Sequence, residues 1–102
     1  MDSITDETTL KAAISSGEER LVLFYAEWCP FCVAFLPVYE KLAAGPKRLK
    51  FLVDEFGALE EEYSIEVVPT VLFFKDGRLA ARLDGILGKG LDARMLAGFL
   101  RR

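Results

Sequence analysis

Trp28-Cys29-Pro30-Phe31-Cys32 is the stretch around which the fold and chemistry of this chain are organised. It contains both cysteines and the only tryptophan of the 102 residues. The apolar run 21–26 precedes it, and residues 33–44 after it carry apolar side chains at helical spacing. Two cysteines two residues apart, at a strand-to-helix junction, can close to a disulfide and reopen. The stretch therefore predicts a redox-active dithiol.

The composition is that of one compact folded domain, and we expect it to span residues 1–102. The chain is 52% hydrophobic and 28% charged, with a net charge of −3. No basic patch stands out, which argues against a nucleic-acid partner. The absence of histidine removes His-based acid–base catalysis and most common metal sites.

The polar, acidic segment 1–7 lacks the features of a signal peptide. The longest apolar runs, such as 21–26, are far shorter than the roughly 20 residues that a membrane-spanning helix needs. We therefore expect a cytoplasmic protein with no membrane association. In that compartment a C-x-x-C pair is more often catalytic or metal-binding than a structural disulfide.

Hydrophobic periodicity predicts alternating helices and strands. Helices are expected at 7–16, 33–44, 55–63 and 91–100, and strands at 21–26, 49–54, 70–75 and 78–83. Asp76-Gly77 is a strong hairpin turn between the last two strands, and Pro37 predicts a kink in the second helix. Strand–helix–strand units pair in parallel through right-handed crossovers. The expected fold is α/β, with a central mixed sheet of four to five strands flanked by helices on both faces.

The position of each cysteine predicts its role. The thiolate is the reactive form, and the first turn of a helix offers unpaired N–H groups and a positive dipole. We expect Cys29, at that end, to be the thiolate, and Cys32, one turn inside, to be the protonated resolving thiol. Pro30 stiffens the turn, and Phe31 offers an exposed apolar contact. A zinc site, or a cluster shared between two chains, is the alternative for a cysteine pair, but a closed zinc site needs four ligands.

Over nearly its whole length the chain resembles the thioredoxin family. The matching segments follow the family's order and approximate spacing: 21–26, Ala26-Glu27-Trp28-Cys29-x-x-Cys32, Pro37, Val68-Pro69-Thr70, Phe74-Lys75-Asp76-Gly77 and Gly85. The resemblance implies a thioredoxin fold and a monomeric thiol–disulfide oxidoreductase that reduces protein disulfides. Its redox centre would be the Cys29–Cys32 disulfide, with no other cofactor. Electrons would come from an upstream reductase, either thioredoxin-reductase-like or glutathione.

The resemblance also implies roles for individual residues. Cys29 would be the nucleophile and Cys32 the resolving thiol. Pro69 would follow a cis peptide bond, and the Val68 backbone would pair with an extended substrate segment. Trp28 and Gly85 would line the docking surface, next to Pro30 and Phe31. Lys50 falls where the family has a lysine near the buried sulfur, although a solvated surface lysine is an equally good interpretation.

Three departures from the family pattern leave the direction of electron flow open. Pro30-Phe31 is a glutaredoxin-style dipeptide, and the second helix is about one turn shorter than usual. Leu23 stands where a buried Asp is usual in the family. Deprotonation of Cys32 must therefore use water, neutral Lys50 or Glu27. Glu27 can also be interpreted as a solvated surface charge.

Three other functions are therefore kept as alternatives: a glutathione-dependent glutaredoxin-like reductase, a more oxidising disulfide donor or isomerase, and a non-enzymatic interaction module. Glutaredoxins usually carry a Gly-Gly pair where this chain has Gly85-Ile86, which argues against the first of them.

Overall fold

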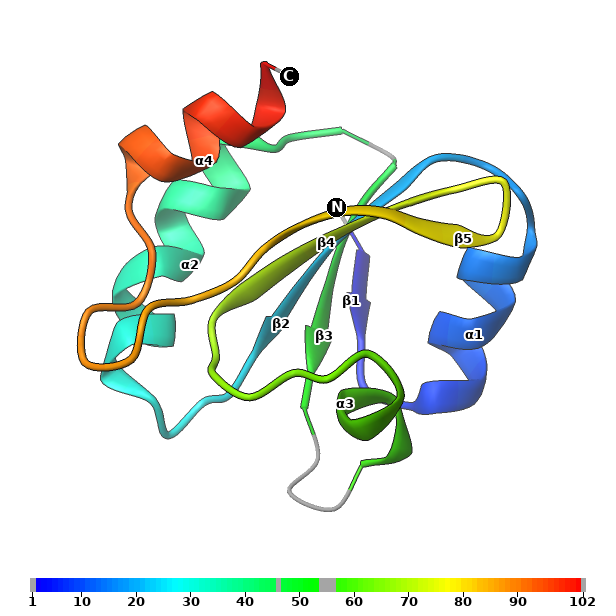
Figure 1. The fold of residues 1–102 in the computed structure, drawn as a ribbon, viewed down its shortest axis with the longest axis horizontal. Coiled ribbons are helices and arrows are strands. Elements are labelled where there is room, and N and C mark those ends of the chain that lie inside the picture. The colour runs from blue at the N-terminus through cyan, green and yellow to red at the C-terminus, as the bar shows by residue number, and fades with distance from the viewer. Residues whose placement is uncertain (1, 46, 54–56, 102) are drawn as a thin grey trace.

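A five-stranded sheet with helices on both faces forms the molecule (Figure 1). The computed structural model describes residues 2–45, 47–53 and 57–101. Along the chain the elements are β1 (Asp2–Ile4), α1 (Glu7–Ser15), β2 (Arg20–Tyr25), α2 (Pro30–Leu42), β3 (Arg48–Leu52), α3 (Ala58–Glu62), β4 (Thr70–Lys75), β5 (Arg78–Leu83) and α4 (Ala93–Leu100). No helix among the described residues is long and apolar enough to cross a membrane.

The sheet is mixed, in the order β1-β3-β2-β4-β5. β2 lies at its centre, parallel to β3 and antiparallel to β4. β1 pairs in parallel with β3, and β5 pairs in antiparallel fashion with β4. Residues 21–24 of β2 are fully buried, because strands flank β2 on both sides and helices cover both faces. The expected mixed sheet with helices on both faces is confirmed.

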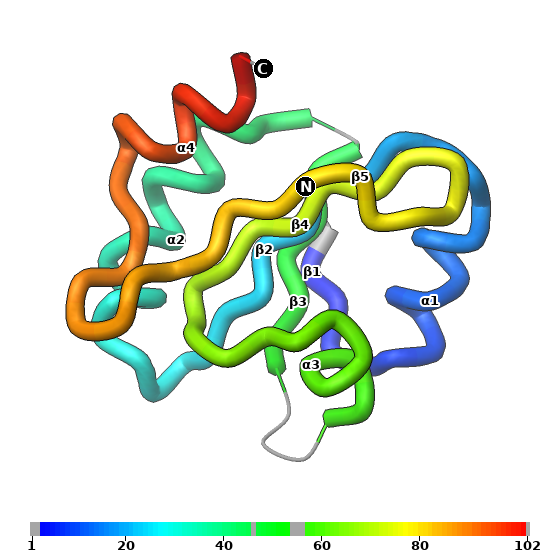
Figure 2. The backbone as a smooth tube through the Cα atoms, in the orientation of Figure 1, coloured from blue at the N-terminus to red at the C-terminus, as the bar shows by residue number. Residues whose placement is uncertain are grey.

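Two hydrophobic cores lie on opposite faces of the sheet, and β2 supplies both of them. Val22 and Phe24 point into the core under α1 and α3. Leu21 and Leu23 point into the core under α2 and α4. Figure 2 shows the two helix pairs on opposite sides of the strands. Side chains alternate along a strand, so a strand with no polar alternation must be covered on both faces.

Most expected elements are found, with differences at their ends. α2 begins at Pro30, three residues before the apolar pattern at 33–44, because Pro suits the first helical turn, where it was expected. α4 begins at Ala93 because Asp92 caps it, accepting a hydrogen bond from the Met95 N–H at 2.9 Å. Pro37 lies inside α2, and the kink expected there stays a prediction. Of the helix expected at 55–63, residues 55 and 56 lie outside the described residues, and the helix runs over Ala58–Glu62. Residue 54 of the strand expected at 49–54 also lies outside them, and that strand runs over Arg48–Leu52.

The strand β1 is not expected from the sequence. Its three residues are too few to show a period, and they form a strand only because β3 offers an open edge. Asp6, just beyond β1, lies among the expected capping residues of the first helix, and its carboxylate accepts the Thr9 N–H at 2.8 Å.

Candidate active site

The two cysteines lie where the central strand gives way to α2. β2 ends at Tyr25, and Cys29 is the N-cap residue of α2. Pro30 takes the first helical position, where its missing N–H would have had no partner. The Val33 N–H donates to the Cys29 carbonyl at 3.0 Å, so Cys32 lies within the first helical turn. The placement of the pair at a strand-to-helix junction is confirmed.

The two sulfur atoms have different surroundings. Both cysteines are free. Cys32 is 1% exposed, and its Sγ accepts a hydrogen bond from the Ala26 N–H at 3.5 Å. Burial raises the pKa of Cys32 to about 12, although the Ala26 hydrogen bond opposes this shift. The Cys29 thiol, 6% exposed, donates to the Val68 carbonyl at 3.7 Å. Cys32 is therefore held as a neutral thiol, as expected for the inner member of the pair.

Three chain segments meet on the side of Cys29. The peptide bond between Val68 and Pro69 is cis, as expected. The buried Thr70 hydroxyl donates to the Val67 carbonyl at 2.6 Å and accepts the Gly85 N–H at 3.1 Å. A Cβ atom at Gly85 would overlap the Pro69 carbonyl oxygen. The proline loop and the segment that follows β5 are therefore joined at Thr70 and Gly85.

A groove of about 220 Å³ opens beside Cys29. Of the expected docking residues, Trp28, Phe31 and Val68 line it, and Trp28 is 78% exposed. Pro30, Pro69 and Gly85 do not line this groove. The other lining residues, which sequence reasoning missed, are Glu66, Val67, Leu87 and Gly88. The glycine-rich stretch 85–90 is a signal for Leu87 and Gly88 alone, since an apolar residue within a glycine-rich loop is well placed for contact.

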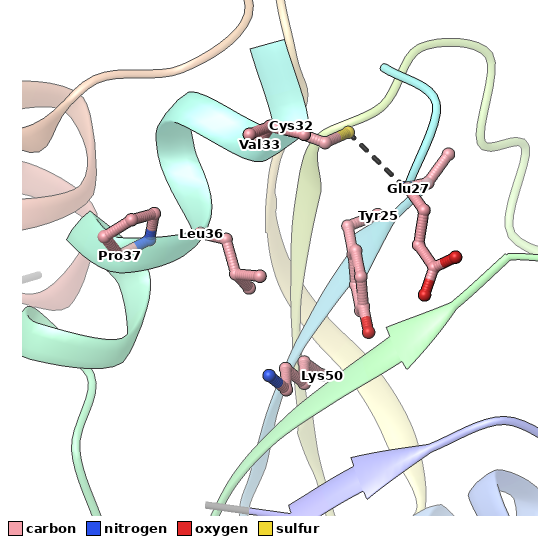
Figure 3. A pocket seen from close by; sticks show the side chains of 8 residues that line it. Tyr25, Glu27, Cys32, Val33, Leu36, Pro37 and Lys50 are labelled. Atoms are coloured by element: carbon pink, nitrogen blue, oxygen red, sulfur yellow. Dashed lines mark hydrogen bonds between the residues drawn. The ribbon is translucent and has the colours of Figure 1, made fainter. Parts of the chain in front are cut away.

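A second cavity, of about 360 Å³, lies on the side of Cys32 (Figure 3). Its lining residues are Tyr25, Ala26, Glu27, Cys32, Val33, Leu36, Pro37 and Lys50. The Lys50 Nζ lies 3.6 Å from the Glu40 carboxylate and 6.0 Å from the centre of the Tyr25 ring. The Lys50 side chain is only 17% exposed, so it is not a fully solvated surface lysine. Glu27 is exposed at the cavity rim.

Charges at this cavity also act on Tyr25. Burial and then the carboxylates of Glu27 and Glu40 raise the pKa of its hydroxyl. Leu23 pairs with Lys50 across β2 and β3, but it is fully buried in the core under α2. Because residue 23 is a leucine, it supplies no carboxylate. The charged residues that line the cavity are Glu27 and Lys50.

Comparisons with known proteins agree with this geometry. Residues 2–97 match the family model described as Thioredoxin. The chain is 35% identical to a thioredoxin of Mycoplasmoides gallisepticum, over 87% of this chain and 92% of the relative. It is 36% identical to a protein disulfide isomerase-like protein of Oryza sativa, over 87% of this chain and 26% of the relative. Among solved structures, Plasmodium falciparum thioredoxin superposes with a TM-score of 0.81 at 26% identity, covering 99% of this chain and 97% of that one.

The family match spans the dithiol, the cis-proline loop and all five strands. It joins a C-x-x-C pair at a helix start to the sheet order found in the structure. The chain therefore belongs to the thioredoxin family and is a thiol–disulfide oxidoreductase.

Proposed function

We propose that the chain reduces protein disulfides, with Cys29 as nucleophile and Cys32 as resolving thiol. The observation that carries this assignment is the division between the two cavities. Cys29, 6% exposed, lines the groove that exposed apolar side chains flank, whereas Cys32, 1% exposed, lines the separate cavity with Glu27 and Lys50. An incoming disulfide reaches Cys29 first.

In the proposed reaction the Cys29 thiolate attacks one sulfur of the substrate disulfide. The substrate S–S bond breaks, a mixed disulfide forms on Cys29, and the first substrate thiolate leaves and takes a proton. Cys32 then loses its proton and attacks the Cys29 sulfur, which releases the second substrate thiolate. The substrate gains two electrons, and the chain is left with a Cys29–Cys32 disulfide. This disulfide is the only redox centre that the reaction needs.

The proton of Cys32 has to leave through the cavity on its side. We assign its acceptance to water in that cavity, with Glu27 and Lys50 as the charged groups that bias it. The Glu40 carboxylate keeps the Lys50 ammonium at the cavity rather than in bulk solvent. Lys50→Met and Glu27→Gln should each slow release from the mixed disulfide and shift its pH profile, while formation of the mixed disulfide on Cys29 changes less.

The remaining parts of the proposal concern the setting of the reaction. We propose a monomeric, cytoplasmic, single-domain protein that takes electrons from an upstream reductase. A thioredoxin-reductase-like donor is favoured over glutathione, because Gly85 is followed by Ile86 and not by a second glycine. Turnover coupled to thioredoxin reductase and NADPH, compared with turnover coupled to glutathione, tests this preference.

The central test is insulin disulfide reduction with a small dithiol as donor. We expect turnover well above the uncatalysed rate for the wild type and none for Cys29→Ser. Cys32→Ser should instead accumulate a mixed disulfide on Cys29, which mass spectrometry detects. Wild-type turnover no faster than that of Cys29→Ser would contradict the proposal.

A disulfide donor or isomerase is the second candidate. It is favoured by Pro30-Phe31 between the cysteines and by 36% identity to a protein disulfide isomerase-like protein of rice. A redox titration against glutathione separates the two functions. A potential close to about −270 mV, the value for thioredoxin, supports the reductase, whereas one near about −180 mV or above supports the oxidant.

A further inference from the structure

The groove beside Cys29 contains one charged amino acid. Among the described residues that line it, Glu66 is the only acidic or basic one. Glu66 is exposed, and it forms no ion pair with any described residue. The other described residues that line the groove carry no competing Asp, Glu, Lys or Arg charge. The Glu66 carboxylate is therefore available to an incoming charge.

Glu66 is only two residues from Val68, whose carbonyl contacts the reacting sulfur. The Val68 carbonyl meets the Cys29 thiol at 3.7 Å, and Glu66 is two residues before Val68. Two residues span at most about 7 Å of chain. A substrate whose cysteine sits at Cys29 can therefore bring a side chain from within two residues of that cysteine to the Glu66 carboxylate.

The facing wall of the groove is apolar and fixed in place. Leu87 is 85% exposed in the loop of residues 85–90, which Figure 2 shows in orange beside the start of α2. The Gly90 N–H donates to the Ile86 carbonyl at 2.7 Å, and the Ile86 N–H donates to the Gly90 carbonyl at 3.0 Å. Phe31 packs closely on Gly90: a Cβ atom added at Gly90 would lie only 2.8 Å from the Cβ atom of Phe31. The loop therefore presents Leu87 as a preformed contact.

We propose that Glu66 selects substrates by charge, an inference that rests on the proposed function. The preferred occupant of the groove is an extended segment of a disulfide-bonded protein with Lys or Arg within two residues of the reacting cysteine. The basic side chain pairs with Glu66, and an apolar neighbour of the cysteine packs on Leu87. Opposite charges accelerate encounter and lengthen its lifetime, whereas an acidic segment is repelled.

The test uses two disulfide-linked peptide dimers with blocked ends and a leucine beside the cysteine. One carries Lys two residues away on each side of the cysteine, and the other carries Gln at the same positions. Pre-reduced protein is mixed with each peptide, and the second-order rate constant is followed by the fluorescence of Trp28, the only tryptophan. We expect the Lys peptide to react about three- to fivefold faster at low ionic strength. The difference should shrink at about 0.5 M salt.

Three variants test whether the preference belongs to Glu66. Glu66→Gln should react with both peptides at nearly equal rates, and Glu66→Lys should prefer the Gln peptide. Glu61→Gln removes the same charge from α3, outside the groove, and should keep the wild-type ratio. Equal rates for the two peptides with the wild type, or a preference that persists in Glu66→Gln, would overturn the inference.

The experiments distinguish a failure of the charge selection by Glu66 from a failure of the proposed reductase function. If the wild type reduces insulin but treats both peptides alike, only the charge selection is wrong. If it reduces neither insulin nor either peptide, the proposed reductase function itself is wrong.

Discussion

Gly85 occupies a position where the site has no room for a side chain. A Cβ atom there would overlap the Pro69 carbonyl oxygen, and the backbone of the proline loop cannot yield as a flexible side chain can. We expect Gly85→Ala to lower the free energy of unfolding by about 1–3 kcal/mol, as overpacking does. Insulin reduction should also slow, because the loop that carries Val68 moves. Urea unfolding and the reduction assay measure the two effects.

Gly98 provides the matched control for that substitution. It lies in α4, where an added Cβ would have no atom within 4 Å apart from the backbone of its own helix and its chain neighbours, and its φ is not positive. Alanine favours the helix over glycine, so Gly98→Ala should stabilise the protein by about 0.5–1 kcal/mol and leave reduction unchanged. A Gly85→Ala variant as stable as Gly98→Ala would mean that the contact with Pro69 is not made.

The buried thiol of Cys32 makes the stability of the reduced protein depend on pH. Its pKa is about 12 in the folded state, whereas an unfolded cysteine ionises at about 8.5. Between these values the unfolded state binds fewer protons than the folded state, so the free energy of unfolding falls as pH rises. The contribution is fully present below about pH 8.5. Urea unfolding of the reduced protein at pH 8, 9 and 10 should show this decline.

Cys32→Ser isolates that contribution, because serine does not ionise in this range. Burial also raises the pKa of Tyr39, but this tyrosine is common to both proteins and cancels in the difference between them. The decline between pH 8 and 10 should therefore be shallower in Cys32→Ser. Parallel curves would show that Cys32 is not held neutral by burial.

At the scale of elements, one tyrosine of α2 adds hydrogen bonds to the apolar packing of this helix on the sheet. The buried Tyr39 hydroxyl lies 2.7 Å from the Leu49 carbonyl and 3.1 Å from that of Leu21, and so joins the helix to β3 and β2. Tyr39→Phe leaves these carbonyls without that donor. We expect a loss of about 1–2 kcal/mol in the free energy of unfolding. Chemical denaturation followed by circular dichroism measures it.

Tyr63→Phe serves as the control for loss of a hydroxyl. The Tyr63 ring packs edge-on against Phe74, but its hydroxyl interacts with Glu62 at the surface. Its removal should change the free energy of unfolding by less than about 0.5 kcal/mol. Equal losses in the two variants would argue that the Tyr39 hydrogen bonds contribute nothing specific.

Elements with a strong local pattern were predictable from the sequence, and those created by tertiary contact were not. The unbroken apolar run of β2 and the turn chemistry of Asp76-Gly77 each determine a local structure. β1 has no such pattern, since its three residues become a strand only by pairing with β3. The same reason explains the site: the cysteines are separated by only two residues, whereas Glu66 and Leu87 reach the groove from separate loops.

At the scale of the whole molecule, the sheet separates the two cores, and the helix that carries Cys32 covers one of them. α2, which begins at the active-site turn, packs with α4 on one face. α1 and α3 cover the other face, away from α2 (Figure 1). Val53 and Val68 pack on both the core under α1 and α3 and the cysteine cluster, so neither core is isolated from the dithiol. Damage to either core should cost similar stability, but damage under α2 should expose Cys32 more, because Cys32 lies in that helix.

Leu10 and Leu96 allow that separation to be measured. Both are fully buried leucines, Leu10 in α1 and Leu96 in α4. Each change to alanine should lower the free energy of unfolding by about 2–5 kcal/mol. In a Cys29→Ser background, Leu96→Ala should speed alkylation of Cys32 by iodoacetamide more than Leu10→Ala does at matched stability, because α2 loses its support. Equal alkylation rates would mean that Cys32 is exposed only by global unfolding and that the two cores are coupled as one unit.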